Sequence, residues 1–295
     1  MNSPLQQLFD PLFEEKKVQF WLKREDLNHP TLPGNKWRKL KYNLQAAKSA
    51  GKETLLTFGG AYSNHIAAVA AAGAAFGFAT IGIIRGEEAA IQNKTLMQAV
   101  EQGMQLHFIS RASYREKENS DFIDQLYTTF GDFYLLPEGG TNDLAVKGCE
   151  EIANEITIDY DYLCCSCGTG GTLAGLITAD QGHHQLLGFS ALKGIQDMED
   201  KISALVMTRS GKQFTNWSVN HQYHFGGYAK LPPELFDFIE TFLLKNNILL
   251  DPVYTGKMLF GLNDLIRMDY FERGSIIIAI HTGGLQGWNG FEHMI

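Results

Sequence analysis

The chain has 295 residues, of which 44% are hydrophobic and 20% charged, and its formal net charge at pH 7 is −8. This composition is typical of an ordinary folded protein, and the length favours two domains over one. The acidic balance argues against a nucleic-acid-binding surface. The first seven residues carry neither a basic nor an apolar stretch, so we expect no secretion signal.

Segments typical of strands and of helices alternate along almost the whole chain. The predicted strands span residues 18–23, 54–58, 79–84, 105–109, 133–136, 160–165, 185–190, 217–225 and 275–281. The predicted helices span residues 36–50, 64–76, 94–102, 112–130, 143–155, 172–179, 195–207, 233–246 and 256–271. This alternation predicts an α/β fold, with mostly parallel sheets covered by helices on both faces. Ligands of such sheets bind beyond the carboxyl ends of the strands.

One stretch without charge, residues 66–84, is long enough on paper to cross a bilayer. It consists largely of alanine and glycine, and its pattern changes halfway. Residues 67–76 are typical of a buried helix that ends at Gly77, and residues 79–84 are typical of a buried strand. We therefore expect a helix and a strand of a water-soluble core, and no membrane partner.

Lys36 follows a tight turn that Pro33 and Gly34 impose, at the start of a predicted helix. The electropositive helix N-terminus disfavours an ammonium group and lowers the pKa of an amine placed there. A neutral amine is what bond formation with a carbonyl cofactor requires. The alternative is a turn and helix cap without chemical function.

Residues 168–172 form a glycine-rich turn between a predicted strand and a predicted helix. Glycines let several backbone N–H groups converge on one anion, and the helix dipole adds to the attraction, so a phosphate is the natural ligand. The dinucleotide fingerprint would need a third glycine in place of Leu173. The alternative is a turn that serves only close packing of the helix on the strand.

The four cysteines, Cys149, Cys164, Cys165 and Cys167, invite comparison with a metal site. In a strand over 162–167, Cys164 would point to one face and Cys165 and Cys167 to the other. No second cysteine pair completes a zinc set, so we expect small buried hydrophobic residues, no metal, and a reduced, cytoplasmic compartment.

Six motifs occur in a fixed order: Gly34-Asn35-Lys36, then the segments 59–65, 168–172, 226–228, 250–257 and 280–284. With them the chain resembles the tryptophan-synthase-β-like, fold type II pyridoxal phosphate (PLP) enzymes. More closely, it is similar to the family of 1-aminocyclopropane-1-carboxylate (ACC) deaminase and D-cysteine desulfhydrase. The resemblance implies two open, twisted, mostly parallel sheet domains with the cofactor between them. The larger would comprise residues 1–39 plus 148–295, and the smaller residues 40–147.

The resemblance also implies roles for single residues. Lys36 would bind the PLP aldehyde as a Schiff base, and Lys39 would face the phosphate. Asn64 would bind the ring hydroxyl, and Ser63 the substrate carboxylate or its α-carbon. Ser63 and Asn64 are equally reasonable as N-caps of the alanine-rich helix, and the two roles are compatible.

Further residues of the implied site come from the later motifs. The phosphate would be held by the backbone amides of Gly168, Thr169, Gly170, Gly171 and Thr172. Tyr228 and Tyr254 would flank the substrate as acid/base groups, although an unperturbed phenol has a pKa near 10 and must be lowered before it can act as a base. Thr255 and Thr282 would lie near the ring nitrogen.

The residue after Tyr254 separates two reactions within the family. ACC deaminases carry a glutamate there, which keeps the ring protonated and strongly electron-withdrawing, whereas this chain has Thr255. We therefore predict β-elimination from D-cysteine or a related small amino acid, giving pyruvate, ammonia and sulfide. ACC deamination to 2-oxobutyrate and ammonia is the alternative.

A second alternative is a PLP-binding protein without turnover, but cofactor binding alone does not need Tyr228 and Tyr254. The chain departs from the family pattern in its short length, at Ala61-Tyr62, where an aliphatic residue and glutamine are usual, and around Tyr228. A homodimer is expected.

Overall fold

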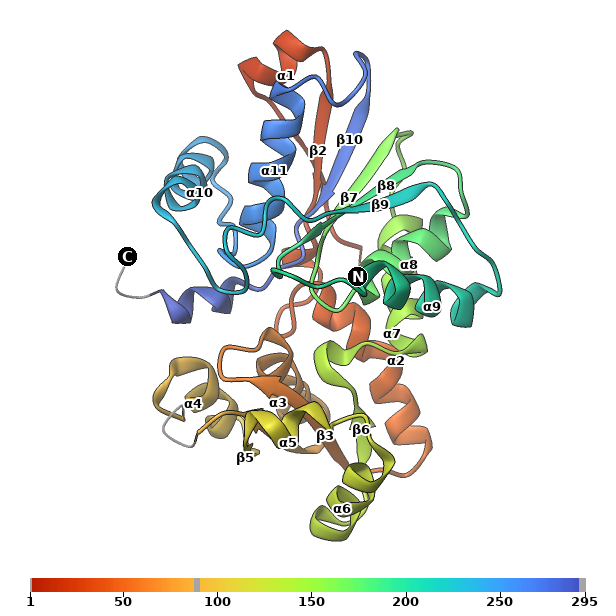
Figure 1. The fold of residues 1–295 in the computed structure, drawn as a ribbon, viewed down its shortest axis with the longest axis vertical. Coiled ribbons are helices and arrows are strands. Elements are labelled where there is room, and N and C mark those ends of the chain that lie inside the picture. Colours follow the sequence, from red (N-terminus) through yellow and green to blue (C-terminus); the bar gives the residue numbers. More distant parts are fainter. Residues whose placement is uncertain (1, 88–90, 292–295) are drawn as a thin grey trace.

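The computed structural model describes residues 2–87 and 91–291, and it contains two sheets that form the centres of two lobes (Figure 1). The upper lobe holds a six-stranded sheet in the order β1-β2-β10-β7-β8-β9, and the lower lobe a four-stranded sheet in the order β5-β4-β3-β6. Neighbouring strands are parallel except for β1 and β2. The predicted α/β fold with two mostly parallel sheets is confirmed.

The strands are β1 Leu5–Leu8, β2 Gln19–Lys23, β3 Thr54–Gly60, β4 Ala79–Arg85, β5 Met104–Ile109, β6 Tyr134–Leu136, β7 Tyr162–Cys167, β8 Gln185–Ser190, β9 Trp217–Asn220 and β10 Ile276–Ile280. The α-helices are α1 Pro11–Lys16, α2 Asn35–Ser49, α3 Asn64–Phe76, α4 Lys94–Glu101, α5 Arg111–Arg115, α6 Ser120–Phe130, α7 Asp143–Asn154, α8 Gly171–Asp180, α9 Met198–Ser210, α10 Pro233–Asn246 and α11 Thr255–Arg267.

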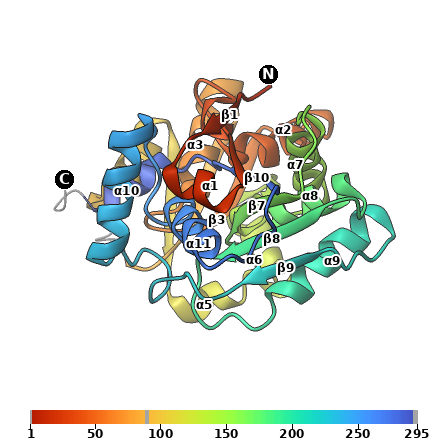
Figure 2. The same cartoon turned by 90° about the horizontal axis from the view of Figure 1, so that it is seen from above.

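Helices cover both faces of each sheet. In the upper lobe α1, α10 and α11 lie on one face and α7, α8 and α9 on the other (Figure 2). The alternation of β7 side chains shows this directly: Cys164 packs in the first core, and Cys165 and Cys167 pack in the second. All four cysteines are buried free thiols, as the sequence predicted. In the lower lobe α2, α3 and α4 cover one face of the sheet, and α5 and α6 cover the other.

The uncharged stretch 66–84 forms most of α3 and β4 and is not a membrane helix. Helix α3 ends at Gly77, which has a left-handed φ of 76° and donates its N–H to the carbonyl of Gly73. Among the described residues, no helix is long and apolar enough to cross a bilayer.

Several predicted elements were wrong in their extent. The helix expected over 112–130 is two helices, because Asn119 caps α6 by accepting the N–H of Asp121 and so starts a new helix. The strand expected over 217–225 ends at Asn220, whose side chain accepts the N–H of Gln222. Sequence reasoning missed β1 and α1, although Asp10 followed by Pro11 is a helix-start signal that caps α1.

The bounds of other elements shifted by a few residues. The strand expected over 160–165 lies two residues further on, as β7. The helix expected from 195 begins at Met198, and the one expected to end at 271 ends at Arg267, shortly before the left-handed Asp269. The predicted domain boundaries at 39/40 and 147/148 remain a prediction, and both fall inside continuous helices, α2 and α7, which pack against each other.

Candidate active site

The start of α2 is seated on the carboxyl end of β10. Gly34 precedes the helix with a φ of 89°, which favours glycine, and the N–H of Asn35 donates to the carbonyl of Thr282 at 3.1 Å. A Cβ atom on Gly34 would lie only 2.3 Å from that same carbonyl oxygen. Only glycine therefore allows the chain to pass this close to Thr282. The contact fixes the position of the first turn of α2, which carries Lys36.

Two lysine amines from α2 point to one carbonyl of the lower lobe. Lys36 Nζ lies 3.2 Å from the carbonyl oxygen of Gly139, and Lys39 Nζ lies 3.4 Å from the same atom. Lys39 Nζ also donates to the hydroxyls of Thr141 at 3.1 Å and Thr169 at 3.3 Å. These two hydroxyls share a hydrogen bond of 2.5 Å, so the two lobes meet at the amines.

The pKa of Lys36 is lowered well below its usual value, as predicted, but the main causes are not the helix N-terminus that we predicted. Burial of the amine contributes most, and the positive charge of Lys39 follows. The second amine comes from one turn further along the same helix, so both effects depend on how α2 packs. A neutral Lys36 amine is a competent nucleophile and proton acceptor near pH 7.

The glycine-rich turn and the start of α8 form an anion cradle beside Lys39. Gly170 is the N-cap of α8, with a φ of 79° and no side-chain cap hydrogen bond. The N–H groups of the first turn therefore have no carbonyl acceptor within the helix. A Cβ atom on Gly171 would lie 3.1 Å from Lys39 Nζ and 2.8 Å from the Thr141 methyl carbon. Open N–H groups, a cation and side-chain-free space fit a phosphate group.

Ser63 and Asn64 open α3 at the carboxyl end of β3. Ser63 Oγ accepts the N–H groups of His65 and Ile66 at 3.2 and 3.3 Å, which confirms it as the N-cap. Asn64 is the first residue of the helix, so its expected role as a cap was wrong. Its amide faces Gly284, where a Cβ atom would lie 2.6 Å from Asn64 Nδ2.

The two predicted tyrosines lie together on the upper lobe. Their rings are 6.1 Å apart and meet edge to face. Tyr228 donates its hydroxyl to the carbonyl of Tyr62 in the lower lobe at 3.3 Å, and Tyr254 packs on Gly168, where a Cβ atom would lie 3.1 Å from the ring. Burial raises the pKa of both phenols, that of Tyr254 well above its ordinary value. Both phenols therefore hold their protons near pH 7.

A third set of groups is a buried row of hydroxyls at the ends of β7, β10 and the start of α11. Thr282 Oγ1 lies 3.3 Å from Thr255 Oγ1 and 3.3 Å from Ser166 Oγ. The nearby carboxylate of Asp251 accepts the N–H groups of residues 253–255 at 2.7–3.0 Å. Its oxygens are thus engaged by the backbone that starts α11.

Sequence reasoning missed other polar groups at this site. They are Gly139, Thr141, Ser166 and Asp251, described above, and His65. Its Nε2 lies 2.8 Å from Thr57 Oγ1, and burial with the nearby charges of Lys36 and Lys39 lowers its pKa well below the usual value. The available signals were the turn at Gly139-Gly140 after a predicted strand and the Ser-Asn-His motif.

A depression of about 430 Å³ lies away from this site, at the amino ends of β7 and β8. Its polar groups pair with one another: Asp180 binds His184 Nδ1 at 2.5 Å and Asn216 Nδ2 at 2.9 Å. Because ligands of parallel sheets bind at the opposite, carboxyl ends, the site between the lobes is the stronger candidate.

The fold and this site define a two-lobed α/β protein in which two buried lysine amines and a glycine-rich helix start meet between the lobes. Residues 2–283 match the family described as "Pyridoxal-phosphate dependent enzyme", and the chain belongs to this family. Its cofactor is therefore pyridoxal phosphate.

Within this family, the chain is similar to proteins named for two activities. A bifunctional D-cysteine desulfhydrase/1-aminocyclopropane-1-carboxylate deaminase of Arabidopsis thaliana is 28% identical, over 92% of this chain and 73% of the relative. A D-cysteine desulfhydrase of Klebsiella pneumoniae is 26% identical, over 90% of this chain and 87% of the relative. A crystal structure of an ACC deaminase homologue has a TM-score of 0.86 with 28% identity and covers 98% of this chain and 91% of that one.

Proposed function

We propose that this enzyme eliminates the β-substituent of a small amino acid, with D-cysteine or a close relative as substrate, and forms pyruvate, ammonia and sulfide. The observation that carries the choice of reaction is the buried hydroxyl pair of Thr255 and Thr282. A hydroxyl cannot provide the counter-charge of a carboxylate, so it supports a weaker electron sink.

The residues of the site are suited to hold PLP. The cradle at Gly168, Thr169, Gly170, Gly171 and Thr172, with Lys39 beside it, would bind the phosphate. Lys36 would bind the aldehyde, Asn64 the ring hydroxyl, and Thr255 with Thr282 the ring nitrogen. When bound, the cofactor supplies an electron sink for the bond that breaks at the substrate α-carbon.

Different side chains around the substrate would bind its carboxylate, accept the α-proton and donate a proton to the leaving group. Ser63, at the N-terminus of α3, would bind the carboxylate, because a helix N-terminus attracts an anion. The neutral Lys36 amine would take the α-proton, and a protonated phenol, Tyr254 or Tyr228, would give its proton to the departing sulfur. The C–H and C–S bonds break, a C=C bond forms, and water then hydrolyses the resulting enamine to pyruvate and ammonia.

ACC deamination is the second candidate, because a relative that spans nearly the whole chain carries both activities in its name. The weaker sink that Thr255 supports argues against it, since opening a cyclopropane ring lacks the help of a thiolate leaving group.

A panel of D- and L-amino acids plus ACC, scored for sulfide, pyruvate and 2-oxobutyrate, tests the proposal. We expect sulfide and pyruvate in equal amounts from D-cysteine. Production of 2-oxobutyrate from ACC without any sulfide from D-cysteine would favour the second candidate. A yellow protein that converts none of these compounds would favour cofactor binding without turnover.

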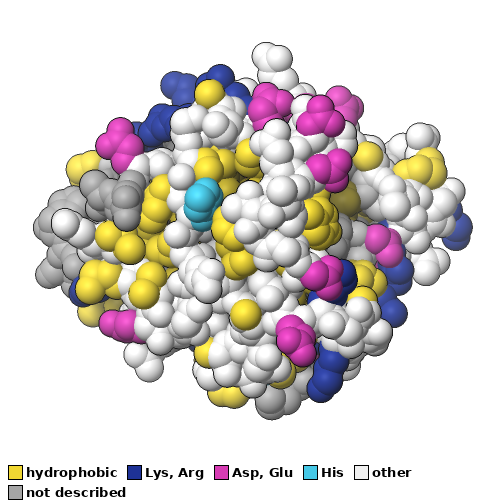
Figure 3. Space-filling model, turned by 90° about the horizontal axis from the view of Figure 1, so that it is seen from below, with side chains coloured by type: hydrophobic (Ala, Val, Ile, Leu, Met, Phe, Trp, Pro, Cys, Tyr) yellow, Lys and Arg dark blue, Asp and Glu magenta, His cyan; other side chains and the backbone are white. Residues whose placement is uncertain are grey.

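We also infer a homodimer and a cytoplasmic location. The four buried free thiols are compatible with a reducing compartment. Figure 3, which views the molecule from below, shows several hydrophobic areas between polar ones. Phe76, Met97 and Val100 are each more than two-fifths exposed on α3 and α4. Light scattering of the purified protein tests the dimer.

A further inference from the structure

The loop that carries Tyr228 has an unusual backbone. Phe225, Gly226, Gly227 and Ala229 all have positive φ, between 52° and 120°. Two of these four residues are not glycine, and L side chains rarely adopt this region of φ. Such a conformation persists only where the surroundings hold it in place, so something must fix this loop.

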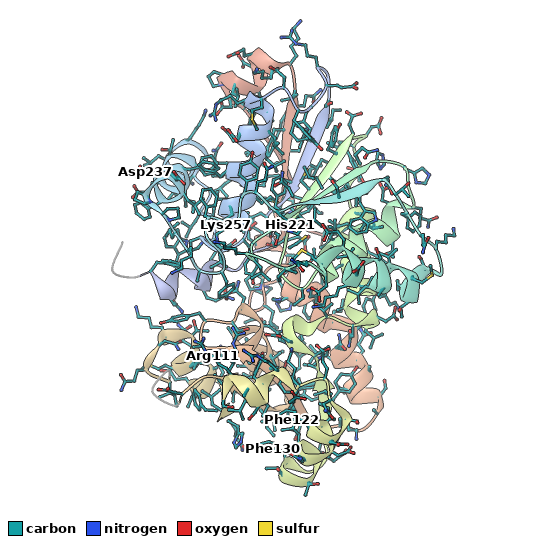
Figure 4. The ribbon with its side chains drawn as sticks, viewed as in Figure 1. Arg111, Phe122, Phe130, His221, Asp237 and Lys257 are labelled. Atoms are coloured by element: carbon teal, nitrogen blue, oxygen red, sulfur yellow. The ribbon has the colours of Figure 1, made fainter. Side chains whose placement is uncertain are left out.

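Lys257 of α11 provides that restraint. Its Nζ donates to the carbonyl of His224 at 3.0 Å and to the carbonyl of Gly227 at 2.7 Å. The side chain is almost completely buried, at 1% exposure, and lies within the upper lobe (Figure 4). The second carbonyl belongs to the peptide bond that leads directly into Tyr228.

The same face of α11 anchors the rest of the loop. Asp264 accepts the hydroxyl of Tyr223 at 2.8 Å, and the Phe260 ring packs edge to face on Phe225 at 4.9 Å. Lys257, Phe260 and Asp264 follow one another at helical spacings of three and four residues, so they share a face. Of these three side chains, the lysine is the one that binds the backbone next to Tyr228.

We propose that Lys257 is a positioning residue, which holds the 224–227 turn so that the Tyr228 hydroxyl faces the substrate beside Tyr254. This inference rests on the proposed function, because it assigns a use to Tyr228 in that reaction. Helix α11 begins at Thr255, directly after Tyr254. Helix α11 therefore acts on three groups of the site. It carries the Thr255 hydroxyl, it begins directly after Tyr254, and it fixes Tyr228 through Lys257.

The test compares Lys257→Met, which keeps the length and loses the donors, with Lys257→Arg, which keeps a cation. Lys245→Met is the matched control, since Lys245 is a partly exposed lysine on α10 that pairs with Asp10. In the cofactor-loaded enzyme, we expect hydrogen exchange of residues 221–230 to rise roughly tenfold in Lys257→Met and to stay unchanged in the control. Lys257→Gln, which keeps an uncharged NH2 group on a shorter side chain, replaces the methionine variant if that variant does not fold.

Kinetics provide a second measurement, in which the effect of Lys257→Met on kcat should depend on Tyr228. A purely structural role of Lys257 would not produce this dependence. We expect Lys257→Met to lower kcat roughly tenfold to a hundredfold, with partial rescue by Lys257→Arg. In a Tyr228→Phe background, the same substitution should cost less than about twofold, because both changes remove one interaction.

Two results would overturn the proposal: loop exchange unchanged in Lys257→Met, or a loss of rate that adds fully to that of Tyr228→Phe. Failure of the proposed function is a different result, namely no turnover by the wild-type enzyme. The exchange measurement would then still decide whether Lys257 holds the loop.

Discussion

Gly148 lies where α7 crosses α2, and its replacement by alanine tests how tightly that crossing fixes the positions of Lys36 and Lys39. A Cβ atom at Gly148 would lie 1.8 Å from the backbone carbonyl oxygen of Arg38. Because carbon and oxygen atoms rarely approach closer than about 3.3 Å, the helices would have to separate by roughly 1.5 Å.

Two effects of opposite sign decide the outcome of Gly148→Ala. Alanine favours the helix over glycine by about 1 kcal/mol. Against this, overpacking costs about 1–3 kcal/mol, and separation also stretches the buried Arg38 pairs, whose rupture costs about 3–5 kcal/mol. These pairs join Arg38 Nη1 to Glu151 on α7 at 3.1 Å and to Glu155, the C-cap of α7, at 2.7 Å. We therefore expect a net loss of about 2 kcal/mol or more in the free energy of unfolding.

Urea unfolding followed by circular dichroism measures this loss, with Asn154→Ala on the exposed end of α7 as the control. The same displacement moves Lys36 and Lys39, so we also expect kcat to fall roughly a hundredfold. A Gly148→Ala protein that is as stable as wild type and fully active would show that α2 and α7 adjust freely, and the reasoning would be wrong.

Three further predictions concern single side chains. Lys36→Ala should abolish borohydride-reducible attachment of the cofactor and all turnover; a reducible adduct mapped to Lys193, the nearest rival, would contradict the assignment of Lys36. Thr255→Glu should change the visible spectrum of the bound cofactor and slow elimination from D-cysteine roughly tenfold to a hundredfold. A wild-type enzyme that opens ACC efficiently and leaves D-cysteine untouched would contradict the reasoning from Thr255. Lys257→Met should change the pH dependence of stability, because burial lowers the pKa of Lys257 to about 8 from 10.5. Between these values the unfolded chain binds more protons, so the wild-type free energy of unfolding should rise by roughly 2 kcal/mol relative to Lys257→Met from pH 7.5 to 10. Urea titrations of both proteins at the two pH values measure this, and parallel curves would contradict it.

Local chemistry along the chain determined much of this protein. Helix α3 has the bounds that the sequence predicted because Ser63 caps its start and Gly77 ends it, and both signals act within a few residues. Gly34 likewise indicates the turn before Lys36, because the backbone there has a conformation that glycine adopts most readily. The alternation of strand-like and helix-like segments predicted an α/β fold with mostly parallel sheets for the same reason, because burial pattern and propensity are local; the division into two sheets was implied only by the family resemblance.

Contacts between distant segments decided the rest. The lowered pKa of Lys36 depends on how α2 is buried and on a second amine beside it, and the pairing of Thr255 with Thr282 joins a helix start to a strand end. The Tyr228 loop shows this limit: Gly226-Gly227 indicates a turn, but the sequence does not predict positive φ at Phe225 and Ala229. That conformation is held from α11 by Lys257, almost thirty residues further on. A local pattern cannot encode this contribution, because the buried amine and the two carbonyls that it binds meet only after the chain has folded.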